Sequence, residues 1–258
     1  MKRRIIPVVF ALDGSLVRSE GFTWHQRLGN LTAQVERYSE WNLDELIYID
    51  IGATRNPNLI CDDYYKKYVT PVADVCRMPL TFGGGIFNES HAERLFRYGA
   101  DKIVISTAAI ENPNLIKRLV ETYGSQAICI SLDIKLIDND YSLTGGASSI
   151  IYKDININDH INRCQDLGCG EFFLNAVHCD GYAKGYDITL INKIIKIASV
   201  PVISCGGANS LKHFKDGLDE TNTSALAAGN FFNFRELSYP MLKTQLYKLY
   251  PDTIRKPL

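Results

Sequence analysis

The sequence repeats one pattern at an interval of about 122 residues, and this repeat strongly constrains the fold. Gly85 in the segment FGGGI stands 122 positions before Gly207 in SCGGA. Phe10, in an apolar run near the start, stands 123 positions before Asp133. An internal repeat of this length predicts two structural half-units within the chain.

Short apolar, β-branched runs alternate with longer amphipathic stretches such as residues 89–100 and 189–198. Eight such runs predict strands: residues 5–12, 45–51, 79–86, 102–107, 127–134, 171–177, 201–208 and 224–229. Eight strand–helix units predict an α/β protein with a closed parallel (β/α)8 barrel, the TIM barrel. We expect one domain over residues 1–258, with half-barrels at about 1–123 and 124–258.

Two segments interrupt the strand–helix alternation. Residues 138–154 follow the fifth predicted strand and predict a hairpin that covers the barrel mouth. Trp24, His25 and Gln26 follow the first predicted strand. We expect these three residues in a flexible loop.

Composition favours a protein that handles small molecules. The chain carries 28 Lys and Arg residues against 29 Asp and Glu, a formal net charge of −1. Binding to nucleic acid requires a concentrated basic surface, so we expect no such partner. The N-terminal apolar run is too short for a signal peptide or membrane span, and the seven cysteines lack CxxC spacing. We therefore expect a cytoplasmic protein with reduced cysteines, no metal and no cofactor.

In such a barrel, functional groups gather where the strands end, whereas the strand starts form the opposite face. Asp133 lies at the end of the fifth predicted strand, and Asp180 follows the sixth. If the two halves matched at this position, a carboxylate equivalent to Asp133 would stand at the end of the first strand. Phe10 stands there instead, and phenylalanine cannot transfer a proton. Asp13, three positions later, is the substitute that the sequence leaves open.

Glycine-rich turns follow one predicted strand in each half, in FGGGI and in CGGAN. Because glycine has no Cβ, backbone N–H groups in such turns can approach an anion. A second small-residue turn follows 22 positions later; it includes Thr107 in the first half and Gly229 in the second. The duplication predicts two phosphate sites on opposite sides of the mouth. Tight turns without a ligand are the alternative.

Motifs along essentially the whole chain resemble the HisF family, the cyclase subunit of imidazole glycerol phosphate synthase. They are RIIPVVFALDG, DELIYIDI, TFGGGI, GADKIVISTAAIENP, SLDIK, DGYAKGYD, SCGGA and ALAAGNFFNFRE. In that family a HisH-type glutaminase releases ammonia, which crosses the barrel to a bis-phosphorylated substrate. Two aspartates there act as general acid and base. The resemblance therefore implies a HisH-type partner and a phosphorylated small-molecule ligand.

The resemblance also assigns roles to individual residues. Asp133 matches the second catalytic aspartate, Asp180 lies near that catalytic position, and Phe10 stands where the first aspartate would be. The other implied positions are one phosphate site at Gly85, Ser106 and Thr107, another at Gly181, Gly207, Ala228 and Gly229, a substrate-loop cation at Arg18, an ammonia gate of Arg4, Glu45, Lys102 and Glu171, and a glutaminase contact at Asp101.

The gate matches the family without exception, whereas the opposite end departs from it. Phe10 replaces the first catalytic aspartate, and Leu12 replaces a lysine. Ser106 and Gly229 replace the usual asparagine and serine, and Arg18 replaces a lysine. General acid–base catalysis typically contributes ~10²–10⁴-fold in rate. We therefore expect cyclase chemistry to be impaired and the ligand to differ.

This combination resembles HisF-like subunits that accompany HisH-like glutaminases in bacterial surface-polysaccharide pathways. Those subunits supply ammonia to convert an acetamido group on a nucleotide sugar into an acetamidino group, as in lipopolysaccharide O-antigen biosynthesis. A separate ATP-dependent sugar amidotransferase performs the last chemistry. This is our first hypothesis. The alternatives are an authentic cyclase in histidine biosynthesis and an inert scaffold or activator of the glutaminase.

Overall fold

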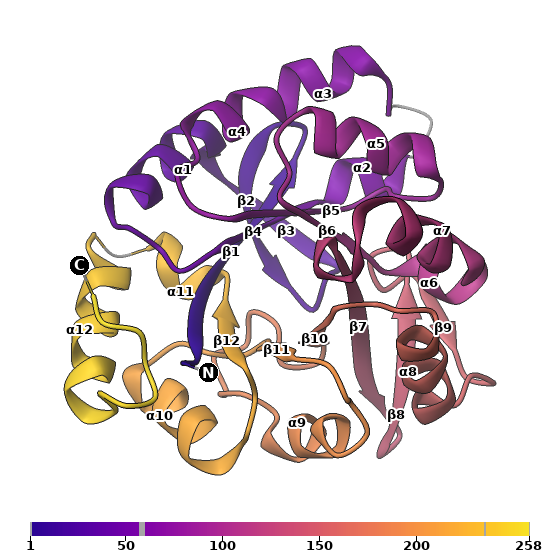
Figure 1. Cartoon of the computed structure of the whole chain (residues 1–258). Coiled ribbons are helices and arrows are strands. Elements are labelled where there is room, and N and C mark those ends of the chain that lie inside the picture. Colours follow the sequence, from indigo (N-terminus) through magenta and orange to yellow (C-terminus); the bar gives the residue numbers. More distant parts are fainter. Residues whose placement is uncertain (1, 57–59, 235, 258) are drawn as a thin grey trace.

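The computed structural model describes residues 2–56, 60–234 and 236–257. Eight parallel strands close into a barrel with helices around it (Figure 1). In order around the ring they are β1 (Arg4–Leu12), β4 (Leu46–Asp50), β5 (Leu80–Gly83), β6 (Lys102–Ile105), β7 (Ile128–Ile137), β10 (Glu171–Ala176), β11 (Val202–Cys205) and β12 (Ala225–Ala228). Pairing of β12 with β1 completes the ring, and the predicted TIM barrel is confirmed.

Helices connect successive barrel strands and cover their outer faces. They are α1 (Leu31–Glu40), α2 (Ile51–Arg55), α3 (Asp62–Tyr68), α4 (Thr70–Val75), α5 (Glu89–Arg97), α6 (Thr107–Glu111), α7 (Asn114–Tyr123), the 3₁₀ turn η2 (Ser125–Ala127), α8 (Ile157–Asp166), α9 (Ile188–Ile195), α10 (Leu211–Glu220), α11 (Asn230–Asn233) and α12 (Ser238–Leu249). Several begin at a capping side chain: Asn88 and Asp187 each accept a hydrogen bond from a backbone N–H in the first turn of α5 and α9. No helix in the described ranges is long and apolar enough to cross a membrane.

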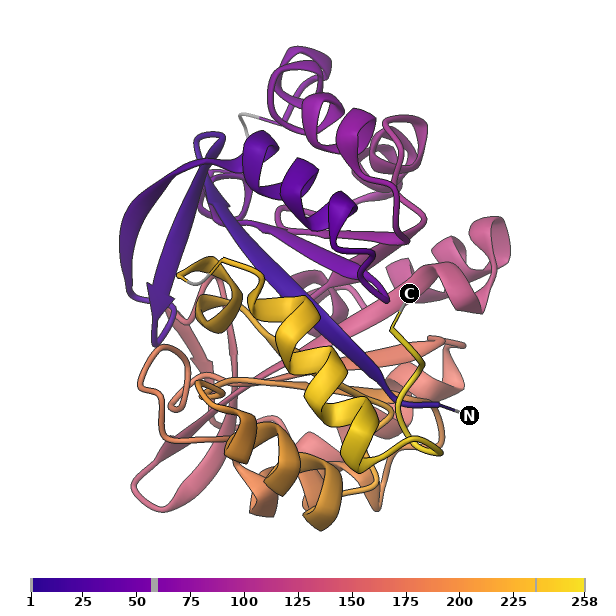
Figure 2. The same ribbon diagram turned by 90° about the vertical axis from the view of Figure 1, so that its left-hand side faces the viewer.

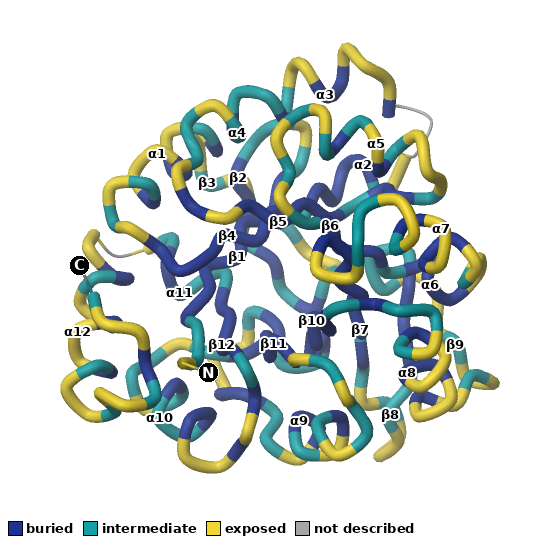
Figure 3. The backbone as a smooth tube through the Cα atoms, viewed as in Figure 1, coloured by how far each residue is buried: buried dark blue, intermediate teal, exposed yellow. Residues whose placement is uncertain are grey.

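The strands are buried on both faces, which explains why they read as continuous apolar runs. One apolar layer fills the barrel interior and includes Ile6, Val8, Phe10 and Phe173. A second, larger layer lies between the strands and the helices. Figure 3 shows the central strands largely buried, with exposed residues on the outer faces of the helices. The barrel interior is therefore largely apolar.

Two antiparallel hairpins extend the sheet. The first consists of β2 (Ser15–Glu20) and β3 (Trp24–Asn30), and β2 pairs with the end of β1. The second adds β8 (Asp140–Gly145) and β9 (Ile150–Tyr152) to β7. In Figure 2 the β2–β3 hairpin lies at the left, on the side away from both termini.

The hairpin predicted within residues 138–154 is confirmed. The expectation of a flexible loop at Trp24, His25 and Gln26 is wrong, because these residues form the first part of β3. They pair in register with Glu20, Ser19 and Arg18. The division into two half-barrels stays a prediction.

Candidate functional site

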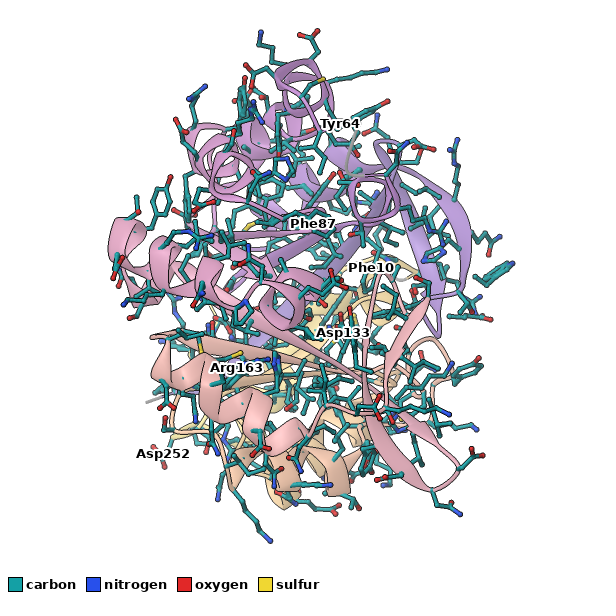
Figure 4. The ribbon with its side chains drawn as sticks, turned by 90° about the vertical axis from the view of Figure 1, so that its right-hand side faces the viewer. Phe10, Tyr64, Phe87, Asp133, Arg163 and Asp252 are labelled. Atoms are coloured by element: carbon teal, nitrogen blue, oxygen red, sulfur yellow. The ribbon has the colours of Figure 1, made fainter. Side chains whose placement is uncertain are left out.

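A cavity opens where the barrel strands end. Its lining residues come from both halves of the chain: Phe10, Phe22, Ile49, Ile51, Thr54, Gly84, Gly85, Ile86, Phe87, Val104, Ser106, Thr107, Ala108, Ser131, Asp133, Ala147 and Asn175. Figure 4 shows Phe10, Phe87 and Asp133 at this part of the barrel. Asp133 is the one ionisable residue in this lining. The remaining wall is largely aliphatic and aromatic.

Asp133 lies deep in the site and is held by three side chains. Ser106 Oγ donates a hydrogen bond to its Oδ2 at 2.7 Å, and Ser131 Oγ and Asn175 Nδ2 donate to its Oδ1 at 2.8 and 2.7 Å. Burial raises the pKa of Asp133, while these donors act in the opposite direction. The carboxyl group is fixed in position and favours carrying a proton more than a free aspartate does.

Phe10 shares the cavity with Asp133 and is almost fully buried. Its ring meets Phe22 in an edge-to-face arrangement with centroids 5.9 Å apart. On another side it faces Gly229, where an added Cβ would lie 3.0 Å from the ring. The position that symmetry assigns to an acid is therefore part of an apolar wall.

Two other aspartates near the first strands do not replace the missing acid. Asp13 forms an ion pair with Arg27 at 2.9 Å on the exposed side of the hairpin, and it does not line the cavity. Asp50 ends β4, but its carboxylate accepts hydrogen bonds from Tyr64 Oη and Ala53 N. Burial raises the pKa of Asp50 to about 6. Its partners hold it outside the lining, so the substitution by Asp13 that the sequence left open is not supported.

A second cavity opens beside the first, between the ends of β10, β11 and β12. It is lined by Asp180, Gly181, Ala183, Cys205, Gly206, Gly207, Ala208, Asn209, Ala228, Gly229 and Asn230. All four residues predicted for the second phosphate site lie in this lining. At Gly207 an added Cβ would come within 2.1 Å of Gly185 O. Only glycine fits this close backbone approach.

The three residues predicted for the first phosphate site also come together, in the lining of the first cavity. The Ser106 hydroxyl, however, donates to Asp133. Thr107 Oγ1 accepts a hydrogen bond of 2.9 Å from Gly146 N, in the turn between β8 and β9. Both hydroxyls thus have protein partners, and the second hairpin lies against this side of the mouth.

The β2–β3 hairpin lies against the second cavity. Ser19 Oγ donates to Asp180 Oδ2 at 2.7 Å, and Gly21 N donates to Asp180 O at 3.0 Å. Asn230 Nδ2 donates to Ser19 O at 2.9 Å. Burial raises the pKa of Asp180 to about 6. Arg18, the predicted substrate-loop cation, forms an ion pair with Glu20 on the same strand.

The four predicted gate residues meet in a ring at the start of the strands. Arg4 contacts both Glu45 and Glu171, and Lys102 Nζ lies 3.2 Å from Glu45 Oε1 and 2.7 Å from Glu171 Oε2. Thr81 Oγ1 adds a bond of 2.9 Å to Glu45. Burial opposes the charge on Lys102, but the two glutamates outweigh it and raise its pKa. The ring is closed by four ion pairs.

Asp101, the predicted glutaminase contact, lies beside Lys102 at this end and is exposed. Its Oδ2 accepts a hydrogen bond of 2.9 Å from Leu80 N at the start of β5. Its carboxylate thus has a structural role in addition to any contact with a partner. A charged oxygen still faces solvent.

Sequence reasoning missed the residues that hold the two aspartates. Ser131 and Asn175 bind Asp133 from β7 and β10, and Ser19 binds Asp180 from β2. Ser131 precedes Asp133 by two positions, so the alternation of a strand places both on one face. That spacing was the available signal. Among the described residues, no group of three His, Cys, Asp or Glu side chains is placed to hold a metal.

The fold and the two ends of the barrel define a (β/α)8 protein with a charged ring at one end and two cavities at the other. The family model described as "Histidine biosynthesis protein" matches residues 4–238. Imidazole glycerol phosphate synthase subunit HisF of Staphylococcus carnosus is 34% identical over 249 residues, covering 95% of this chain and 96% of that protein. The HisF subunit of Pasteurella multocida is 34% identical over 255 residues, covering 96% and 97%. The chain belongs to the HisF family.

Proposed function

We propose that this chain is the ammonia-conducting barrel of a glutamine amidotransferase complex, that a HisH-type glutaminase binds at the charged ring, and that the ammonia acceptor differs from the cyclase substrate. Phe10 is the observation that carries the proposal. The cyclase reaction would need a second acid or base opposite Asp133 to close and cleave its substrate. The cavity instead presents the buried phenyl ring of Phe10. The loss of one such group typically lowers a rate by ~10²–10⁴-fold.

The other end of the barrel supports conduction. The ring of Arg4, Glu45, Lys102 and Glu171 is complete and fully paired. Above it the interior is lined by apolar side chains and the neutral thiol of Cys129, whose pKa burial raises well above its usual range. A neutral molecule such as ammonia enters such an interior at far lower cost than ammonium.

At the mouth, the remaining polar groups suit binding and proton handling. Asp133 would hold or move one proton, and Asp180 would stand beside the ligand in the second cavity. Backbone groups at Gly181, Gly207, Ala228 and Gly229 would contact a phosphate, with a second anionic group at Gly85, Ser106 and Thr107. Arg18 would add positive charge, which none of the described lining residues carries.

The acceptor that we propose is a nucleotide-activated sugar with an acetamido group, in surface-polysaccharide biosynthesis. An ATP-dependent partner would activate the amide oxygen, ammonia would add to the carbon, and the oxygen would leave as phosphate. The product is an acetamidino group.

The test combines the chain, a HisH-type glutaminase, the ATP-dependent amidotransferase, ATP, the acetamido nucleotide sugar and glutamine labelled with ¹⁵N in its amide. Unlabelled ammonium is present in the bulk solution. Channelled ammonia gives a labelled amidino sugar by mass spectrometry, and Lys102→Met is expected to reduce the labelled fraction. Product that carries mainly unlabelled nitrogen, or forms equally well without the chain, would contradict the proposal.

The second candidate is an authentic cyclase in histidine biosynthesis, and the names of the relatives favour it. The matched HisF subunits are named for imidazole glycerol phosphate synthase. For this candidate another group must replace the carboxylate that is absent at Phe10. Turnover of the bis-phosphorylated cyclase substrate separates the two candidates.

A further inference from the structure

Two large aromatic side chains stand exposed on one side of the mouth. Trp24, at the start of β3, is 49% exposed, and Tyr182, in the segment after β10, is 51% exposed. Trp24 pairs in register with Glu20, next to Gly21 at the hairpin turn. An added Cβ at Gly21 would lie 3.5 Å from Tyr182 Oη. Both rings therefore belong to one rim, around the hairpin turn.

Each ring has a cation beside it. The Arg18 guanidinium lies 5.7 Å from the Trp24 ring centre, and Lys184 Nζ lies 5.9 Å from that of Tyr182. Arg18 also has unused bonding capacity: one nitrogen contacts Glu20, but Nε is buried and has no hydrogen-bond partner within the described part of the chain. We call Arg18, Trp24, Tyr182 and Lys184 the aromatic rim. Its chemistry suits a ligand that is both aromatic and anionic.

The aromatic rim adjoins the second cavity. Gly181 and Ala183, on either side of Tyr182, line that cavity. An added Cβ at Gly181 would lie 2.7 Å from Glu20 Cγ, so the Glu20 side chain lies against Gly181. Among the described residues, those that line the cavity include no Lys, Arg or His. Arg18 and Lys184 therefore place two cations next to the segments that border this cavity.

From this arrangement we propose that the aromatic rim binds a nucleoside diphosphate, with its base stacked on the exposed rings and its diphosphate directed to the glycine turns of the second cavity. The proposal rests on the proposed function and deepens it: the barrel itself recognises the nucleotide end of a nucleotide-activated acceptor. Stacking suits any base, because every base has an aromatic face. Contacts to the sugar would supply further selectivity.

Glu20 opposes this binding because it pairs with Arg18 and carries the same sign of charge as a diphosphate. A bound phosphate must compete with Glu20 for the guanidinium group of Arg18. Glu20→Gln removes the competing charge and keeps the side-chain shape. We expect this substitution to strengthen binding of a nucleoside diphosphate several-fold.

Trp24 provides a direct reporter, since the chain has two tryptophans. The other, Trp41, packs on Tyr38 with ring centres 5.4 Å apart and lines a separate pocket with Asp44 and Arg255. A Trp41→Phe variant therefore leaves Trp24 as the sole tryptophan. Titration with UDP is expected to quench its fluorescence to saturation. Pyrophosphate, which has no base, is expected to bind more weakly and to leave the fluorescence nearly unchanged.

Affinities are then measured by calorimetry in the full chain. Tyr182→Ala and Trp24→Leu are each expected to weaken UDP binding about tenfold, and to change pyrophosphate binding far less. Tyr247→Ala is the matched control, because Lys2 lies 5.9 Å from that ring in the same kind of cation–aromatic pair. It should leave UDP affinity unchanged.

Equal affinity for UDP and pyrophosphate would overturn the proposal, as would undetectable UDP binding or UDP affinity that neither rim variant changes. These results would leave ammonia conduction untouched, because the labelled-glutamine experiment reads conduction separately. Conversely, failure of ammonia transfer with UDP binding intact would reject the proposed function and retain the nucleotide site.

Discussion

The two ends of this barrel differ in how completely their polar groups are matched. At the start of the strands, two cations and two glutamates form a closed ring of four ion pairs. At the end of the strands, Asp133 is bound by three donors, whereas Phe10 presents an aromatic ring. The charged ring at one end and the polar groups at the other are thus built from separate residues. One can change while the other is kept.

The charged ring is supported by a second ion pair next to it. Asp44, one residue before Glu45, accepts a hydrogen bond of 3.0 Å from Ile5 N, one residue after Arg4. The nearly buried Lys243 of α12 pairs with the same carboxylate. The backbone on both sides of the Arg4–Glu45 pair is therefore fixed by a second ion pair.

The largest expected effect is at the ring. Glu45 is 3% exposed and contacts Arg4, Lys102 and Thr81. Glu45→Gln leaves two partly buried cations short of a counter-charge, so we expect the free energy of unfolding to fall by about 4 kcal/mol. Urea denaturation measures the loss. The control Glu93→Gln removes an exposed ion pair with Arg97 and should lower the free energy of unfolding by less than about 0.5 kcal/mol. If the two variants lost equal stability, the ion pairs of the ring would contribute no more than an exposed pair.

A somewhat smaller loss is expected at the supporting pair. Lys243→Met keeps the side-chain volume but leaves the buried carboxylate of Asp44 with only the exposed Arg255, 4.0 Å away, as a counter-charge. It should lower the free energy of unfolding by about 3 kcal/mol. The double variant Lys243→Met with Asp44→Asn removes both charges and keeps an acceptor for Ile5 N–H. It should recover part of the loss. A double variant less stable than the single one would argue against charge burial as the cause.

At the mouth, ionisation of Asp180 should make the free energy of unfolding depend on pH. Burial raises the pKa of Asp180 from 3.8 to about 6, so the folded state binds this proton more tightly than the unfolded chain does. The stability that it contributes is complete below about pH 4 and is lost as pH rises through about 6. Asp180→Asn should remove about 2–3 kcal/mol of this pH dependence, measured by denaturation at several pH values. The exposed Asp252→Asn variant should keep the wild-type slope of unfolding free energy against pH. If Asp180→Asn also kept that slope, Asp180 would not be the source of the pH dependence.

The smallest effect on the fold is expected at Asp101. Asn in its place can still accept the hydrogen bond from Leu80 N, so we expect the free energy of unfolding to change by less than about 0.5 kcal/mol. Loss of the charge should slow association with a HisH-type glutaminase, most clearly at low salt, as measured by surface plasmon resonance. Unchanged association at every salt concentration would remove Asp101 from the contact.

The sequence predicted the barrel because strands buried on both faces produce a periodic apolar signal. Strand starts and ends then placed Glu45 and Glu171 at one end, and Gly207 and Gly229 at the other. The hairpin after β1 was missed because Ser15–Glu20 is short and gains its stability from pairing with β1, which is a tertiary contact. Local pattern alone does not reveal such pairing.

The partners of the acidic residues were also beyond the sequence. Ser19 meets Asp180 across 161 positions, and Asn175 meets Asp133 across 42. These bonds depend on which strands become neighbours around the ring and on how the hairpin docks. The exposed pairing of Asp13 with Arg27 has the same origin, since the hairpin turns this aspartate away from the cavity.

We propose that this barrel conducts ammonia but lacks cyclase chemistry because Phe10 occupies the place of an acid. The most direct measurement is ammonia-dependent turnover of the bis-phosphorylated cyclase substrate by the wild-type chain, a Phe10→Asp variant and a HisF subunit such as that of Staphylococcus carnosus. Folded protein is matched by circular dichroism. The account predicts wild-type turnover at least 100-fold below that HisF subunit, with a gain in Phe10→Asp. Wild-type turnover equal to that of the HisF subunit would contradict it and favour the histidine-biosynthesis function.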